Sequence, residues 1–185
     1  MAGKNTAVFG IYRTLSEAEA AVDRLMGTGF SSDDISVLLP DNESTRNFAY
    51  KKDTKAPEGT TTGGITGGVV GGTLGLLAGI GALAIPGVGP LIAAGPIMGA
   101  LAGLGVGGAV GGLIGALVGM GIPEFEAKRY EGRVKEGGIL LSAHCDTSEE
   151  IDRAKDVLKQ TGAEDVSSSG EASADTAETD RRSRV

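Results

Sequence analysis

The chain has 185 residues, a formal net charge of −7, one histidine and one cysteine. An acidic balance argues against general nucleic-acid binding, and a lone cysteine excludes an internal disulfide. The length suits one ordinary domain with an appendage, and the 32 glycines are roughly twice the usual share of about 7%.

Residues 1–40 are expected to form a β-α-β unit. Thr6–Tyr12 is rich in strand-forming residues, and Ser16 with Glu19 three positions later predicts a capping box at the start of a helix. Ile35–Leu39 supplies the second strand. The buried face of the helix is expected to carry Ala18, Ala21, Val22 and Leu25.

Residues 138–167 repeat this order of elements. Ile139–Cys145 alternates in the manner of a half-buried strand, and Thr147 with Glu150 forms a capping box. A helix follows, and a short strand is expected around Asp165–Ser167. Its inward-facing residues are expected to be Ile151, Ala154, Val157 and Leu158.

An offset of 133 positions superposes the two units. It places Ala21 on Ala154, Leu25 on Leu158, and Thr28-Gly29 on Thr161-Gly162. Neither unit alone has enough strands to bury a sheet face, so the two halves are expected to share one sheet. The predicted fold class is therefore α+β, a ferredoxin-like sandwich of two β-α-β halves interrupted by a long inserted segment.

Three further segments complete the organisation. Residues 41–59 are polar and are expected to be a linker, and residues 123–137 carry charges at helical spacing, typical of a connecting helix. Residues 168–185 have no apolar period and are expected to be a disordered tail.

The inserted segment, residues 60–122, contains no charged residue and no histidine. Glycine recurs in it at four-residue spacing in two registers, which predicts two helices with a continuous groove for close packing, a glycine zipper. Ile85–Pro90 is the expected turn between them. The helix-packing glycines are Gly63, Gly67, Gly71, Gly75, Gly79, Gly95, Gly99, Gly103, Gly107, Gly111, Gly115 and Gly119.

A glycine-rich helix needs a compensating environment. Each interior glycine costs about 0.8 to 1 kcal/mol relative to alanine, or about 10 kcal/mol for the twelve. A bilayer enforces helix, and both Gly63–Ile85 and Leu91–Met120 reach the about 20 residues that a crossing requires. Glycine contributes little hydrophobicity, however, so a hairpin buried in a soluble oligomer remains the alternative.

Basic residues flank the segment on both sides, which predicts that both termini lie in the cytoplasm. Membrane lipid and further copies of the chain are the expected partners, and the expected location is the cytoplasmic membrane, with the cytoplasm as the alternative. Tyr50, Phe125 and Tyr130 are the only interfacial aromatic candidates. The candidates for lipid head-group contact are Lys51, Lys52, Lys55, Lys128, Arg129 and Arg133.

No catalytic, cofactor or metal site is expected. His144 and Cys145 are adjacent in a strand and so point to opposite faces, which places Cys145 in the core. No other histidine or cysteine is present to complete a metal set. The Gly107-Gly108 pair lacks the preceding strand of a dinucleotide-binding loop, and its glycines are interpreted as packing residues.

Val8–Leu38 (VFGIYRTLSEAEAAVDRLMGTGFSSDDISVL) resembles the N-terminal domain of the bacterial heat-induced general-stress proteins of the YflT-like kind. Ile122–Asp146 (IPEFEAKRYEGRVKEGGILLSAHCD) is similar to the longer, membrane-annotated relatives in that group. The resemblance implies an association with stress. It implies no catalytic residues, because the family, mostly of unknown function, has none established.

Together these observations predict a non-enzymatic, stress-related membrane protein, in which the hairpin anchors and oligomerises a cytoplasmic ferredoxin-like domain. A soluble self-assembling structural protein is one alternative. A sensory module that binds a small ligand on the sheet is another.

Overall fold

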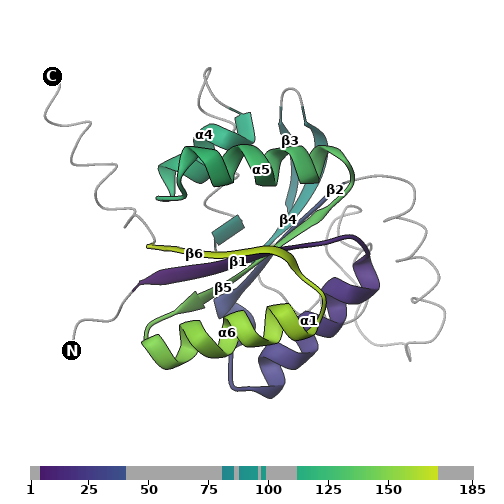
Figure 1. The fold of residues 1–185 in the computed structure, drawn as a ribbon. Coiled ribbons are helices and arrows are strands. Elements are labelled where there is room, and N and C mark those ends of the chain that lie inside the picture. Colours follow the sequence, from purple (N-terminus) through teal and green to yellow (C-terminus); the bar gives the residue numbers. More distant parts are fainter. Residues whose placement is uncertain (1–4, 41–80, 86–87, 96, 99–111, 171–185) are drawn as a thin grey trace, which may run out of the picture.

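The computed structural model describes residues 5–40, 81–85, 88–95, 97–98 and 112–170. They form a mixed α and β fold around an antiparallel sheet with the strand order β3-β4-β2-β5-β1-β6. In Figure 1, helices α1 and α6 cover one face of this sheet, and α4 and α5 lie on the other. The predicted α+β class is confirmed at this level.

The N-terminal unit has β1 (Thr6–Tyr12), α1 (Leu15–Gly27), a short 3-10 helix η1 (Ser32–Asp34) and β2 (Ile35–Pro40). The predicted helix face is confirmed, because all four of its residues are buried. The predicted capping box at Ser16 and Glu19 is wrong. Thr14 is the N-cap, and its hydroxyl accepts from the Glu17 backbone N–H while the Glu17 carboxylate accepts from the Thr14 N–H.

The C-terminal unit has β5 (Ile139–Cys145), α6 (Ser148–Gln160) and β6 (Glu164–Gly170). The predicted capping box of Thr147 and Glu150 is confirmed. The last strand is longer than predicted, since Ser168, Ser169 and Gly170 pair with β1 and are not part of a disordered tail. Small polar residues extend the strand here because β1 supplies the backbone partners.

The two units share the sheet as predicted. β5 lies between β1 and β2 and is antiparallel to both, with Ala143 opposite Val8 on one side and opposite Ile35 on the other. The prediction that β5 is half-buried is wrong, because every residue from Ile139 to Ala143 is buried. Helices cover both faces, so both sets of alternating side chains enter a core.

Each face carries its own hydrophobic core. On one face, β-strand residues such as Val8 and Leu141 pack with Leu25 of α1 and Leu158 of α6. On the other, Phe9 and Leu140 belong to the same core as residues of α4 and α5. Helices α4 and α5, which lie between the two β-α-β units in the sequence, are thus part of the folded domain.

The predicted helical hairpin is wrong over residues 81–94. These residues form two strands, β3 (Gly81–Ile85) and β4 (Gly89–Ala94), which pair with each other antiparallel. β4 also pairs with β2, with Leu38 opposite Ala93. The turn lies at the predicted place, because Ile85 pairs with Gly89 and Gly89 has a positive φ of 109°.

Two physical reasons explain this difference. Without β4, the backbone groups of β2 would form an open sheet edge, and pairing satisfies them. The four-residue spacing also does not discriminate between helix and strand, since positions i and i+4 share a face in both periods. Leu91–Ala94 is a buried run that suits a strand.

The end of the inserted segment is helical, as predicted. Helix α4 (Gly112–Gly119) buries Leu113, Ala116 and Leu117, and α5 (Glu124–Lys135) follows after a short turn. Met98 and Leu113 both lie in the core with Phe9. The predicted membrane helix Leu91–Met120 is wrong at Leu91–Ala94, which belong to β4, and residues 99–111 of it lie outside the described residues.

A membrane-spanning helix is not found among the described residues: none of their helices is both long and apolar enough to cross a bilayer.

Candidate functional site

The corner between α4 and α5 carries the large apolar side chains that are exposed in the described part of the chain. Val118 is 42% exposed near the end of α4, and Phe125 is 67% exposed in the first turn of α5. The connection between the helices ends at Pro123, the residue before α5. This α4–α5 corner (residues 112–125) has one charged residue, Glu124.

Basic side chains lie next to Phe125. The Arg129 guanidinium carbon is 4.5 Å from the centre of the Phe125 ring, a cation–π contact. Lys128 is exposed and pairs with Glu124 at 2.6 Å, and this contact lowers the pKa of the Glu124 carboxyl. The corner therefore combines an exposed aromatic ring with two cations.

The residues predicted to contact lipid differ in the ion pairs that they form within the domain. Arg129 also donates to Asp165 at 2.9 Å, and Arg133 lies 3.3 Å from Glu164 and 3.5 Å from Asp165. Arg133 therefore holds α5 to the start of β6, whereas Lys128 contacts only its own helix in these ion pairs. Contact of these residues with lipid stays a prediction, and Lys51, Lys52 and Lys55 lie outside the described residues.

Tyr130 fixes the position of α5. Its ring is buried, and its hydroxyl donates to the Asp165 carbonyl at 2.8 Å and lies 2.6 Å from the Ser167 hydroxyl. Burial raises the pKa of Tyr130 to about 12. Of the three interfacial candidates, Phe125 is thus exposed and Tyr130 belongs to the core, while Tyr50 lies outside the described residues.

The predicted helix-packing glycines have different surroundings where the structure describes them. Gly95 follows β4 with a φ of +92°, and a side chain there would meet the Ile35 carbonyl and the Ser36 hydroxyl. Gly115 and Gly119 are exposed on α4. The nine other glycines of the predicted zipper, Gly63, Gly67, Gly71, Gly75, Gly79, Gly99, Gly103, Gly107 and Gly111, lie outside the described residues.

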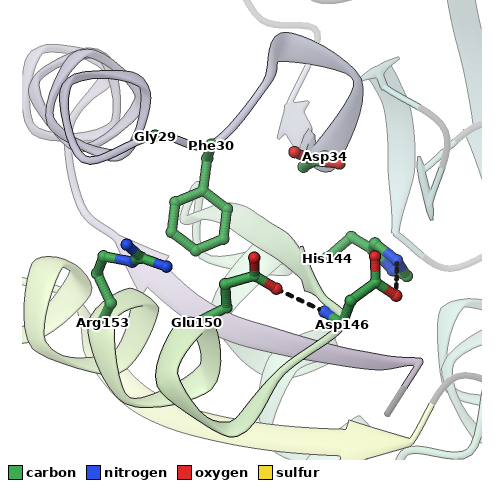
Figure 2. Close-up of a pocket in the computed structure, with 7 residues that line it drawn as sticks. All are labelled: Gly29, Phe30, Asp34, His144, Asp146, Glu150 and Arg153. Carbon is green, nitrogen blue, oxygen red and sulfur yellow. Dashed lines mark hydrogen bonds and ion pairs between the residues drawn. The ribbon is translucent and has the colours of Figure 1, made fainter. Parts of the chain in front are cut away.

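A second candidate is a shallow hollow at the end of β5 (Figure 2). Its volume is about 50 Å³, far below the roughly 300 to 1,000 Å³ of pockets for drug-sized ligands. In Figure 2 the Phe30 ring lies between Arg153 and the carboxylates around His144. The lining residues are Gly29, Phe30, Asp34, His144, Asp146, Glu150 and Arg153.

The carboxylates of this hollow already have partners. Asp34 accepts from the Ser31 N–H at 2.8 Å, and Glu150 accepts from the N–H groups of Asp146 and Thr147. These backbone bonds, that from Asp146 most of all, lower the pKa of Glu150. They are capping interactions, and within the described ranges no group of three or more metal-ligating side chains is present.

The single cysteine lies where the alternation predicts. Cys145 is fully buried in the core beneath α1 and α6, whereas His144 is partly exposed at the hollow beside Phe30. The His144 imidazole lies 3.4 Å from the Asp146 carboxylate. The two residues thus do not converge on one site.

Comparison of the chain with family models, with curated proteins and with solved structures found no match.

Proposed function

We propose that this chain is a non-enzymatic, stress-related protein that attaches a ferredoxin-like α/β domain to a membrane surface. The attachment is peripheral, through the α4–α5 corner and the uncharged segment that precedes it. The observation that carries the proposal is the exposed Phe125 ring with Arg129 stacked on it. The role in stress rests on the resemblance of Val8–Leu38 to the general-stress family.

The strand order supports the ferredoxin-like description. The four strands of the two β-α-β units are adjacent in the order β2-β5-β1-β6. Each unit places its helix on the same face of the sheet, with α1 and α6 in contact. The β3–β4 hairpin extends this arrangement at the β2 edge, and α4 and α5 cover the second face.

The α4–α5 corner has the chemistry of an interfacial site. Aromatic rings with nearby cations are favoured at the boundary between head groups and acyl chains, where the ring enters the apolar layer and the cation stays near phosphate. Arg129 and Lys128 lie on the same helix turn as Phe125 or one turn later. Val118 adds apolar area.

The magnitudes indicate weak attachment by the corner alone. Burying Phe125 contributes about 1.5 to 3 kcal/mol, and each basic residue near an anionic surface about 1 kcal/mol. A total of about 4 kcal/mol corresponds to a dissociation constant of about 1 mM. Stable attachment therefore requires several copies or additional apolar residues, which the uncharged sequence before residue 112 supplies.

A non-enzymatic role is supported by the chemistry of the described residues. The Asp34 and Glu150 carboxylates in the hollow beside Phe30 are committed to helix caps, and the hollow is too small for most substrates. The proposal names no reacting group.

Self-assembly in solution is the second candidate, favoured by α4. Gly115 and Gly119 are exposed on this uncharged helix, and a surface without side chains lets a second backbone approach closely. In this case the α4–α5 corner would be buried between copies.

Vesicle flotation tests the proposal. The full chain should float with vesicles of zwitterionic and anionic phospholipid, and Phe125→Ser and Lys128→Gln should each reduce the bound fraction. Arg24→Gln is the matched control, because this exposed arginine lies on α1, across the sheet from the corner. Flotation that is insensitive to Phe125→Ser would reject attachment through the α4–α5 corner, and a discrete oligomer in buffer without any flotation would reject membrane attachment altogether.

A further inference from the structure

The exposed Phe125 ring at the α4–α5 corner lies beside paired opposite charges. Lys128 forms an ion pair with Glu124 at 2.6 Å. The Arg129 guanidinium carbon lies 4.5 Å from the centre of the ring, and the same side chain pairs with Asp165 at 2.9 Å. The four charges of these two ion pairs sum to zero. The corner therefore presents positive and negative groups side by side and is not a basic patch.

The two carboxylates differ in how far solvent reaches them. The Glu124 side chain is 67% exposed and the Lys128 side chain 61% exposed, so both members of this pair are accessible from outside the domain. The Asp165 side chain is only 20% exposed, and its Oδ2 atom is buried. Asp165 therefore holds the Arg129 guanidinium in place, whereas Glu124 is accessible as an acceptor.

Helical spacing places the exposed groups in two parallel rows on α5. Glu124 and Lys128 are one turn apart, and so are Phe125 and Arg129. The 2.6 Å contact holds the Glu124 carboxylate and the Lys128 ammonium at the same level beside the ring. An acceptor for a cation, a donor to an anion and an apolar ring thus lie within one helical turn of each other.

The charge of the whole chain disfavours an anionic surface. The formal net charge is −7, and an anionic bilayer repels an acidic protein unless a basic patch outweighs this charge. Salt screens charges beyond about 8 Å at physiological ionic strength, so the charges at the corner decide the contact. An anionic head group there would gain Lys128, but it would also lie beside the Glu124 carboxylate and would bring no cation to it.

We propose that the α4–α5 corner recognises a zwitterionic phospholipid head group that carries a phosphate and a primary ammonium. The phosphate accepts hydrogen bonds from Lys128 and Arg129, and the ammonium donates to the Glu124 carboxylate. The Phe125 ring enters the acyl layer beside this head group. The preference rests on the membrane attachment proposed above and adds the class of lipid.

The exchange of partners requires little rearrangement. The Lys128–Glu124 pair is exposed and lies on one helix, so it contributes little to stability, and the lipid supplies an opposite charge to each member. The Arg129 guanidinium has several N–H donors, and it donates to phosphate without leaving Asp165. The quaternary ammonium of phosphatidylcholine has no N–H for Glu124. Binding should therefore be stronger to phosphatidylethanolamine than to phosphatidylcholine.

A substitution at Glu124 distinguishes the two kinds of surface by the sign of its effect. In flotation of the full chain with vesicles of phosphatidylcholine and phosphatidylethanolamine, Glu124→Gln should lower the apparent affinity about twofold to fivefold, the range for one exposed ion pair. If attraction to an anionic surface were the cause, loss of this negative charge would raise the affinity. Glu136→Gln is the matched control, because this exposed glutamate lies at the other end of α5 and should leave binding unchanged.

Lipid composition separates the head-group preference from membrane attachment itself. Replacement of phosphatidylethanolamine by the same mole fraction of anionic phosphatidylglycerol should lower flotation. A rise in NaCl from about 0.05 to 0.5 M should change flotation on the zwitterionic vesicles little, because these surfaces have no net charge to screen. Flotation that requires phosphatidylglycerol, or that rises in Glu124→Gln, would overturn the preference, and attachment would stand if Phe125→Ser still reduced it. No flotation on any of these vesicles would overturn both.

Discussion

Gly95→Ala is the sharpest test of how the glycine-rich segment joins the domain. Gly95 follows the last residue of β4 with a φ of +92°, a conformation that an alanine adopts only with strain of about 1 to 2 kcal/mol. The added methyl group would also meet the Ile35 carbonyl, and would lie 2.5 Å from the Ser36 hydroxyl and 2.6 Å from the Ser36 Cα. Two of these three atoms belong to the backbone and cannot rotate away.

The expected loss of stability follows from these two terms. Overpacking of this kind costs about 1 to 3 kcal/mol, so the substitution should lower the free energy of unfolding by about 2 to 5 kcal/mol in total. The bond from the Ile97 N–H to the Ser36 hydroxyl, 2.9 Å long, is also at risk. Against a total stability of about 5 to 15 kcal/mol, such a loss is readily measured.

Urea unfolding followed by far-UV circular dichroism measures this loss. The matched control is Gly132→Ala in α5, where an added methyl group meets nothing within 4 Å and alanine should stabilise the helix by about 1 kcal/mol. If Gly95 were a helix-zipper glycine, alanine would raise helix propensity and leave the domain as stable as before. An unchanged or higher unfolding midpoint for Gly95→Ala would therefore refute the close approach of Gly95 to β2.

Two further predictions concern caps and ionisation. Thr14→Ala and Thr147→Ala should each lower the free energy of unfolding by about 1 kcal/mol in urea titrations, because each removes the side-chain N-cap of its helix. Ser16→Ala is the control and should have little effect. Equal effects at Thr14 and Ser16 would contradict the assignment of Thr14 as the cap. Burial raises the pKa of Tyr12 and of Tyr130 from 10.0 to about 12, so the folded state holds these protons more tightly than the unfolded chain. The contribution of the two protonated tyrosines to the stability of the fold is complete below pH 10 and is lost as the pH rises toward 12. The urea midpoint should therefore fall across this window, and it should fall less in the double variant Tyr12→Phe/Tyr130→Phe. A double variant with the same decrease as the wild type would contradict this cause.

The two β-α-β units were predictable because their signals are local. Thr6–Tyr12 has the bounds predicted from its composition, and the alternating run Ile139–Cys145 is also a strand over the predicted residues. The internal repeat also indicates the correct N-cap of α1, because the 133-residue offset maps Thr147 onto Thr14 and Glu150 onto Glu17. The repeat therefore favours Thr14 over Ser16 as the N-cap of α1.

The inserted segment was not predictable in the same way. Its four-residue glycine spacing fits a helix face and a strand face equally, so the decision between them rests on tertiary partners. Leu91–Ala94 forms a strand because it pairs with the edge of β2. The spacing of residues in the sequence does not show which strand edge will be available for pairing. The prediction of a helix is confirmed at Gly112–Gly119, where the leucine and alanine side chains pack onto the second face of the sheet.

The candidate site was predictable only in part. Flanking basic residues indicated Lys128 and Arg129, and both lie beside the exposed Phe125 ring. The pairing of Arg133 with Glu164 and Asp165, and the burial of Tyr130, depend on how α5 crosses the sheet. The last residues of β6, Ser168–Gly170, have no apolar pattern, and they form a strand because they pair with β1.

Amide hydrogen exchange of Leu91–Ala94 in buffer without lipid or detergent tests the central claim most directly. If these residues belong to the sheet, their hydrogen-bonded amides should be protected to the same degree as those of Val37–Leu39 in β2. Rapid exchange of Leu91–Ala94 in buffer, with protection gained only in a bilayer, would contradict the account and restore a membrane-inserted segment.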